Sequence, residues 1–279
     1  MIDLQLLNPA ADVEEYRAAA RERVAPYADL LRRHGIDARP VAWTEAGRRA
    51  PALACLAWGY HLRPDEWAAL LAGWPGDVPM VNASTVLRWN TDKRYLADLE
   101  AAGVPVVPTR FVDRADAAAL REARDAFGAD ELVVKPRVSA AAFRTGRVGP
   151  RDPAPGLADA MVQPFLPAVA QEGELSVFLF GGEPAHAVRK VAAPGDFRVQ
   201  REYDGRFTVV DADAEMLGVA RAAVAAAPAP PAYARADLIR RGDGRLAVME
   251  LEMIEPDLYL DLAPQAADAF GAAVAAALR

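Results

Sequence analysis

Long apolar runs, cysteines and secretion signals are scarce or missing in this chain of 279 residues. No stretch approaches the roughly 20 apolar residues of a membrane-spanning helix. The N-terminus MIDLQLLNPAADVEEYR lacks the basic, apolar and small-residue regions of a signal peptide. The one cysteine, Cys55, excludes an internal disulfide and has no metal-ligand spacing around it, so we predict a small core residue. The expected compartment is the cytoplasm.

Lysine is the rarest basic residue. Only Lys93, Lys135 and Lys190 are lysines among 32 basic residues, and the rest are arginines. Arginine therefore serves wherever a generic positive charge is enough. A compact ammonium on a slim stem reaches a phosphate oxygen where a planar guanidinium would clash. Either the three lysines occur where they do by chance, or they stand at positions where arginine cannot substitute. Their local contexts favour the second interpretation.

Basic charge is not in excess, because the formal net charge is -7 and the pI is near 5.1. This balance argues against nucleic acid or an anionic membrane as the main partner, although a local basic cleft remains compatible with it. The length exceeds that of a typical single core, and 53% hydrophobic residues can fill two or three subdomains around a shared cleft.

Strands alternate with helices in the first part of the chain, which predicts a parallel sheet. We place a domain boundary near Ser84 and expect an α/β domain over 1–84 and a second domain over 85–279. The elements predicted before the boundary are a strand over 2–7, a helix over 12–34, a strand over 38–43, an apolar run over 52–60 and a helix opening at Pro64.

The second domain mixes short strands with helices, and no internal repeat is visible. Its segment 136–156 is rich in Gly, Ala, Pro and Arg without a clear period, which predicts a mobile loop. The other predicted elements are helices from Ser84 through about Ala101, over 115–127, over 212–226 and from about 264; strands before Pro108 and over 131–135, 160–165, 174–180, 185–191, 232–240 and 245–254; and a loop over 192–205.

Two strands near the C-terminus, YARADLIR and RLAVMELEMIE, are joined by the turn 241–244, whose two glycines suit a tight hairpin. Residues two apart on a strand share a face, so Arg235 projects with Asp237, and Glu250 projects with Glu252. A hairpin through the turn sets Arg235 and Asp237 close to Glu250. Unpaired acids this close repel, and oxygen ligands of this kind bind Mg²⁺ or Mn²⁺. The alternative is an amphipathic hairpin whose polar face is simply solvated.

An ordered series of segments resembles a known family. The segments are VNASTVLRWNTDKRYLADLEAAGVPVVPT, ELVVKPRVSA, MVQPFLPAVAQEGELSVFLFGGEPAHAVRK, YARADL and MELEMIEPDLYL. From about Asn82 to the C-terminus the chain resembles the ATP-grasp superfamily in its glutathione-synthetase-like branch. Within that branch it is most similar to the ligases of cycloserine biosynthesis, which close O-ureido-serine into a ring.

The resemblance implies an α/β (α+β) ATP-grasp fold in which an N-terminal parallel α/β domain precedes two α+β lobes that grip ATP. The central lobe is expected over about 106–163 and the C-terminal lobe over about 164–279. Lys93 and Lys135 match the lysines that hold the α- and β-phosphates, and Lys190 matches a cation near the γ-phosphate. All three rare lysines thus fall on phosphate-binding positions.

Further roles follow from the same resemblance. The hinge that binds adenine matches Gln163, Pro164, Phe165 and Leu166, and Glu174 matches the acid that bonds the ribose hydroxyls. Without the resemblance, Phe165 and Leu166 are equally compatible with an ordinary hydrophobic core. Glu174 is then equally compatible with a residue that simply begins a strand.

The hairpin residues also receive roles from the resemblance. Arg235 matches the residue that steadies the transferred phosphoryl group, and Asp237, Glu250 and Glu252 match the metal ligands. The segment 195–205 is either a lid that places Arg198 on the substrate or a solvated loop.

Two departures from the family pattern affect details. Relatives usually carry glycines after the phosphate-strand Lys-Pro, whereas this chain has Ser139 followed by three alanines. Alanine lacks easy access to positive φ, so we expect the loop to close differently, with Ser139, Arg144 and Thr145 still able to donate to phosphate. In the first domain, an Arg-Ser followed by Trp-Asp-Tyr in relatives is replaced by 56–61.

The replaced segment keeps Trp58 and Tyr60 as candidate substrate contacts but loses the arginine and the acid, so the cycloserine-type substrate is not carried over. We predict an ATP- and Mg²⁺-dependent carboxylate–amine ligase of specialised metabolism that acts through an acyl phosphate on small amino-acid-like molecules. The alternatives are a non-catalytic nucleotide-binding sensor or assembly protein, and a phosphotransferase that releases a phosphorylated product. A homodimer is the expected assembly because symmetric pairs are the commonest.

Overall fold

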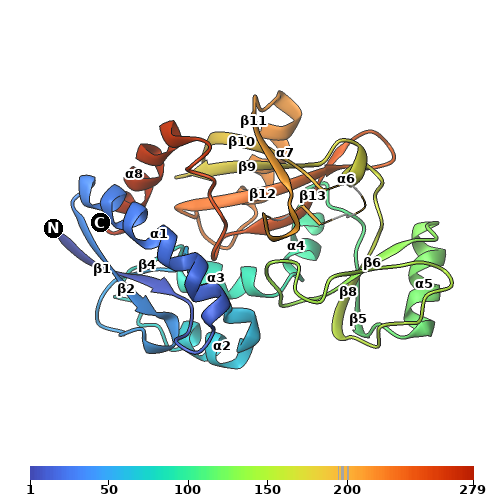
Figure 1. Cartoon of the computed structure of the whole chain (residues 1–279), viewed down its shortest axis with the longest axis horizontal. Coiled ribbons are helices and arrows are strands. Elements are labelled where there is room, and N and C mark those ends of the chain that lie inside the picture. Colours follow the sequence, from blue (N-terminus) through green and yellow to red (C-terminus); the bar gives the residue numbers. More distant parts are fainter. Residues whose placement is uncertain (194, 196–197, 200) are drawn as a thin grey trace.

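The structure, a computed structural model, describes the whole chain except residues 194, 196, 197 and 200. Three sheets follow one another along the sequence (Figure 1). A four-stranded sheet is formed by the N-terminal part, a four-stranded sheet by the middle part and a five-stranded sheet by the C-terminal part. Among the described residues, none of the helices combines the length and apolar character needed to span a membrane.

The N-terminal sheet is parallel, as its alternating strands and helices predict. Its strand order is β2-β1-β3-β4. The apolar run over 52–60 forms only a two-residue strand and then turns. The elements are β1 (Ile2–Asn8), α1 (Glu14–Arg33), β2 (Ile36–Ala42), η1 (Trp43–Glu45), β3 (Ala52–Leu53), η2 (Tyr60–Leu62), α2 (Pro64–Ala72) and β4 (Met80–Val81).

The predicted helix from Ser84 through Ala101 is broken into α3 (Ser84–Thr91) and α4 (Tyr95–Ala101). The break contains Lys93, whose backbone N–H donates to Arg137 O at 3.0 Å instead of continuing a helix. A contact with a residue 44 positions away in sequence cannot be read from local periodicity. The break fixes Lys93 beside the loop that follows β6.

The middle sheet has the order β5-β8-β6-β7 and is covered on one side by α5. The strand predicted before Pro108 is wrong: Val106 makes only an isolated bridge to Val248, and the strand begins after the proline. Strand β7 falls inside the segment predicted as a loop. The elements are β5 (Arg110–Arg114), α5 (Ala117–Phe127), β6 (Leu132–Pro136), β7 (Gly146–Val148) and β8 (Ala158–Pro164).

The C-terminal sheet is antiparallel, with the order β11-β10-β9-β12-β13. Strand β9 has the predicted bounds, whereas β11 was not predicted and is held at the edge by its pairing with β10. The elements are α6 (Ala168–Gln171), β9 (Glu174–Phe180), β10 (Glu183–Val191), η3 (Arg201–Tyr203), β11 (Arg206–Val210), α7 (Ala214–Ala225), β12 (Tyr233–Arg240), β13 (Leu246–Glu252), η4 (Pro264–Ala266) and α8 (Ala267–Ala277).

Helix α8 joins the C-terminal sheet to the N-terminal part, and both termini lie on the same side of the molecule in Figure 1. Phe270 of α8 is fully buried, and its ring lies 5.7 Å from that of Tyr27 in α1 and 5.4 Å from that of Phe180 in β9. One apolar cluster therefore spans both ends of the chain. The domain division near Ser84 stays a prediction.

The loop after β6 has a left-handed backbone at three positions that are not glycine. The φ angles are +49° at Ala141, +55° at Ala142 and +51° at Arg144. This is the region where relatives carry glycines, so the alanines adopt the positive φ angles that glycine adopts most easily instead of avoiding them. Each such residue costs on the order of 1–2 kcal/mol.

Replacing Ala141 and Ala142 together by glycine should raise the free energy of unfolding by about 1 kcal/mol. Relief of the left-handed strain is offset in part by the larger backbone entropy that glycine loses on folding. Urea denaturation measures the difference. Ala18→Gly in the exposed face of α1 is the control and should lower stability by about 1 kcal/mol. A double variant less stable than the wild type would contradict the strain assignment.

Candidate functional site

One cleft, with a cavity volume of about 260 Å³, is lined by side chains from all three parts of the chain. Of the residues singled out from the sequence as site residues, all but Arg144 line it. The lining residues are Trp58, Tyr60, Lys93, Lys135, Ser139, Thr145, Gln163, Pro164, Phe165, Leu166, Glu174, Lys190, Arg198, Arg235, Asp237, Glu250 and Glu252.

Two of the three lysines share one carboxylate. Lys93 Nζ lies 3.0 Å from Glu250 and also donates to Ser139 O, while Lys135 Nζ lies 4.0 Å from the other oxygen of Glu250. Both lysines are at most 7% exposed. Burial lowers the pKa of Lys135. Although burial opposes ionisation of Glu250, the two ammonium groups hold the pKa of its carboxyl below the ordinary value.

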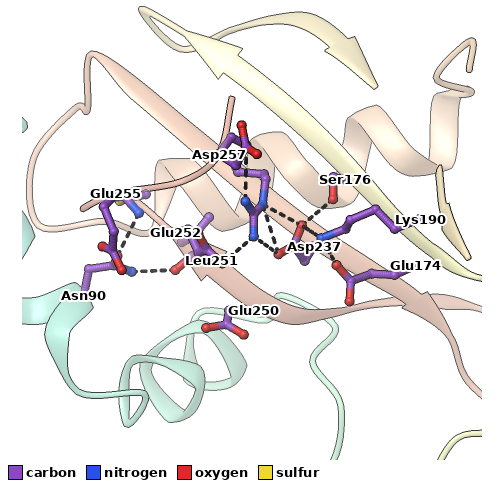
Figure 2. A network of polar contacts seen from close by, with 12 residues as sticks. Asn90, Glu174, Ser176, Lys190, Asp237, Glu250, Leu251, Glu252, Glu255 and Asp257 are labelled. Carbon is purple, nitrogen blue, oxygen red and sulfur yellow. Dashed lines mark hydrogen bonds and ion pairs between the residues drawn. The ribbon is translucent and has the colours of Figure 1, made fainter. Parts of the chain in front are cut away.

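The third lysine belongs to a second group of charges, shown in Figure 2. Lys190 Nζ lies 3.1 Å from Asp237 and forms an ion pair with Glu174. Asp237 also accepts hydrogen bonds from Ser176 Oγ and from Arg235 Nε, the latter at 3.0 Å. Burial alone would raise the pKa of Asp237, but Arg235 and Lys190 hold it well below the ordinary value.

Glu174 has a less favourable environment than Asp237. Its side chain is nearly fully buried and has the shared ammonium of Lys190 as its ion-pair partner. Burial therefore dominates and raises the pKa of Glu174 to about 7. The folded protein holds this proton up to about pH 7, whereas the unfolded chain releases it near the ordinary value of 4.5.

Glu174 should make the protein less stable as the pH rises. Its contribution to stability is complete below pH 4.5 and is lost as the pH passes through about 7, because the unfolded chain then holds fewer protons. Relative to Glu174→Gln, wild-type stability should fall by roughly 3 kcal/mol between about pH 4 and pH 8. Chemical denaturation at several pH values measures this. Glu183→Gln, at the exposed start of β10, is the control, and a pH-independent difference for Glu174→Gln would contradict the assignment.

The hairpin places its polar residues as predicted. Arg235 pairs in register with Glu252, and Asp237 with Glu250. Arg235 Nη2 contacts Glu252 and lies 2.9 Å from Asp237, so one guanidinium serves an acid on each strand. Burial raises the pKa of Glu252 to about 7, despite the charge of Arg235.

The acids of the hairpin are not unpaired, which corrects the premise from which a metal was inferred. Asp237, Glu250 and Glu252 each have a basic partner. In the described part of the chain no group of three acids, histidines or cysteines is arranged to hold a metal ion. A protein cage for a metal is therefore absent from those residues, and Mg²⁺ would fit here only with further oxygens from a ligand and water, which is its usual coordination.

The predicted hinge runs from the end of β8 into the segment before α6. Gln163 is buried and donates through Nε2 to Thr109 Oγ1 at 2.9 Å. Phe165 N–H donates to Glu131 O at 2.8 Å, and the guanidinium of Arg147 lies 3.8 Å from the centre of the Phe165 ring. These contacts fix the backbone between the middle and C-terminal sheets. The adenine role stays a prediction.

The predicted substrate contacts lie at the end of the cleft formed by the N-terminal part. Trp58 Nε1 donates to Glu255 O at 2.9 Å, and Tyr60 is buried beside it. The guanidinium of Arg198 lies 3.6 Å from the centre of the Tyr203 ring. The predicted lid over 195–205 falls in part on residues 196, 197 and 200, which lie outside the described residues.

Several residues of the cleft were not singled out from the sequence. Arg23 of α1 is one of many arginines and carried no signal. Glu255 follows Glu252 by three residues in MELEMIEPD, and this proximity to the predicted metal acids was a signal that could have found it. The other members of this group are Tyr16, Arg201, Asp257 and Tyr259.

Known proteins resemble this chain in sequence and in structure. The cycloserine biosynthesis protein DcsG of Streptomyces lavendulae is 31% identical, over 91% of this chain and 93% of its own length. The crystal structure of D-cycloserine synthetase DcsG matches with a TM-score of 0.84 and 29% identity, over 99% of this chain and 100% of that one. No protein-family model matches the chain.

More distant structures share the fold. The D-alanine–D-alanine ligase of Bacillus anthracis, solved with ATP, matches with a TM-score of 0.70 and 16% identity, over 100% of this chain and 96% of that one. The ATP-grasp ligase PsnB, solved with its minimal precursor, gives 0.69 and 16%, over the full length of both chains. The predicted ATP-grasp fold is thereby confirmed. The chain belongs to the ATP-grasp family of ATP-dependent carbon–nitrogen ligases, and it is related to D-cycloserine synthetase.

Proposed function

We propose that this ligase uses ATP and Mg²⁺ to convert a small carboxylate into an acyl phosphate, which a nitrogen nucleophile then attacks. The observation that carries the proposal is the convergence of Lys93, Lys135, Lys190 and Arg235 in one cleft. Four buried cations suit a triphosphate and the negative charge that develops during phosphoryl transfer.

The charge pairs support the proposed phosphate site. Lys93 and Lys135 are paired with Glu250, and Lys190 with Asp237. Phosphate oxygens offer these lysines alternative partners in the same cleft. Lysines that exchange partners in this way would free carboxylate oxygens of Glu250 and Asp237.

The freed carboxylates are the groups that would hold Mg²⁺, together with Glu252. Mg²⁺ is usually bound by one or two carboxylates plus phosphates and water, so a protein cage is not required. When bound, the cation would neutralise phosphate charge. Arg235, which contacts Asp237 and Glu252, would remain to hold the transferred phosphoryl group.

The remaining assignments follow the resemblance to the ATP-grasp family. The hinge over 163–166 would bind adenine through its backbone, Glu174 would bond the ribose, and Ser139 would donate to phosphate. Trp58, Tyr60 and Arg198 would contact the substrate. The class of substrate is a small amino-acid-like molecule, as the kinship with D-cycloserine synthetase suggests.

The test uses purified protein with Mg²⁺, ATP and a panel of small carboxylates and amines. We expect ADP release that depends on the carboxylate, with an amide-type product when an amine is present. Hydroxylamine added without the amine should trap the acyl phosphate as a hydroxamate.

The alternatives give different results in the same experiment. ATP binding without carboxylate-dependent ADP release would indicate a nucleotide-binding protein without turnover. A stable phosphorylated product that never condenses with an amine would indicate a phosphotransferase.

A further inference from the structure

The chain immediately after β13 is held firmly by side chains from other elements. Leu251 in β13 and the three consecutive residues 253–255 have backbone groups bound in this way. The bonds are from Asn90 Nδ2 to Leu251 O (2.7 Å), from Met253 N to Asn90 Oδ1 (2.8 Å), from Asn82 Nδ2 to Met253 O (2.8 Å), from Tyr233 Oη to Ile254 O (2.7 Å) and from Trp58 Nε1 to Glu255 O (2.9 Å).

These bonds place the side chain of Glu255 in the cleft. Glu255 is 8% exposed and lines the cleft beside Trp58 and Tyr60. Figure 2 shows it at the Asn90 end of the polar network, apart from Asp237 and Lys190. A buried carboxyl on so constrained a backbone has little freedom to turn away.

Glu255 differs from the other acids that line the cleft. Each of the others has an ion pair with a lysine or arginine, and within the described residues the carboxylate of Glu255 has none. The paired acids are Glu174 and Asp237 with Lys190, Glu250 with Lys93 and Lys135, Glu252 with Arg235, and Asp257 with Arg23 and Arg201.

A buried acid without a partner is costly unless it is protonated or a ligand supplies the cation. The charged and titratable groups around Glu255 are Glu252 and Glu250 of β13, Lys93, the phenol of Tyr60 and the phenol of Tyr233. Burial, and then the charge of Glu252, raise the pKa of Glu255 well above its ordinary value. The carboxyl of Glu255 therefore keeps its proton to a higher pH than an ordinary glutamate does.

We infer that Glu255 binds a protonated amine of the substrate, at the end of the cleft opposite the nucleotide hinge. An organic ammonium fits a single carboxylate flanked by aromatic side chains, because the carboxylate supplies charge and the rings supply apolar and cation–π contact. Mg²⁺ fits this place less well, since it needs several oxygen ligands and Glu255 supplies a single carboxylate. The inference rests on the proposed function, whose substrate it narrows to molecules with a primary ammonium.

Binding of an ammonium should release the carboxyl proton of Glu255. Below the pKa of the ligand-free carboxyl, amine affinity should rise about tenfold for each pH unit, because one proton is displaced for each amine bound. Glu255→Gln cannot release this proton, so its amine affinity should be nearly independent of pH in the same range.

The experiment is isothermal calorimetry on the full chain, with ADP and Mg²⁺ and without them. The ligands are the common amino acids in L and D forms and D-cycloserine, each hit being repeated with its N-acetyl derivative. For the wild type we expect at least one amine to bind with proton release, detected by buffers of different ionisation enthalpy. Its N-acetyl derivative should not bind.

Glu255→Gln should weaken that amine by about 10- to 100-fold, the effect of one charge-assisted hydrogen bond, while ADP·Mg²⁺ affinity stays within about twofold. Glu255→Asp, which keeps the charge, should give an intermediate loss and replaces Glu255→Gln if that variant fails to fold. Glu100→Gln, on the exposed side of α4, is the matched control.

Three results would overturn the inference: no amine distinguishes the wild type from the Glu255 variants, N-acetylation leaves binding unchanged, or Mg²⁺ alone binds in a Glu255-dependent way without any amine. The proposed function has a separate failure. If ADP·Mg²⁺ does not bind the wild type, the ligase mechanism is wrong, whatever the amine titrations give.

Discussion

Replacing Lys135 by arginine should weaken ATP·Mg²⁺ binding by roughly 100-fold, although the charge is kept. The ammonium is 7% exposed and lies 4.0 Å from Glu250, with Lys93 on the same carboxylate. A planar guanidinium is larger and needs a fork of acceptors that this place does not offer. The loss corresponds to one or two charge-assisted hydrogen bonds to phosphate. Calorimetry with ATP and Mg²⁺ measures it without knowledge of the substrate.

The matched control is the reverse change at a position where any cation should serve. Arg121→Lys, on the exposed face of α5 in the same lobe, should bind ATP as the wild type does. If Lys135→Arg retains affinity within about threefold while circular dichroism shows a native fold, Lys135 does not bind phosphate, and the scarcity of lysine in this chain has another cause.

Glu250→Gln should have opposite effects on binding and on turnover. Without the carboxylate, Lys93 and Lys135 lose their competing partner, so ATP without Mg²⁺ should bind about tenfold more tightly. The added effect of Mg²⁺ on affinity should largely disappear, and carboxylate-dependent ADP release should fall by roughly 1000-fold, as expected when a principal electrostatic group is lost. Titrations with and without the metal, and single-turnover assays, measure these quantities.

Glu100→Gln serves as the control here as well, and its nucleotide affinity should respond to Mg²⁺ as in the wild type. An undiminished Mg²⁺ effect in Glu250→Gln would remove Glu250 from the set of metal ligands. Unchanged metal-free affinity would show instead that the two lysines do not compete between Glu250 and phosphate.

The order of elements was largely predictable from the sequence, because hydrophobic periodicity and turn residues are local signals. Strand β9 has the predicted bounds, and the parallel N-terminal sheet followed from the alternation of strands with helices. The short strands β7 and β11 and the break at Lys93 were missed. Each depends on a distant partner: β6 for β7, β10 for β11, and Arg137 O for the break.

In the loop after β6, tertiary contacts override the local backbone preference of alanine. The alanines predicted a different closure, but the backbone takes left-handed angles at Ala141 and Ala142. The sheet and the contact of Lys93 with Ser139 O fix the ends of this loop, and tertiary contacts of this kind can outweigh about 1–2 kcal/mol of local strain per residue.

The sequence by itself determined the kind of chemistry: which cations are lysine, which strands carry the acids, and that the hairpin sets Arg235 and Asp237 close to Glu250. Only the tertiary structure decided which charges pair. Three parts of the chain meet in one cleft. Because the interaction of buried charges depends strongly on the distance between them, the folded geometry determines which charges pair, and sequence spacing does not. For that reason the lack of an ion pair at Glu255 within the described residues emerges only once the partners of the other acids in the cleft are known.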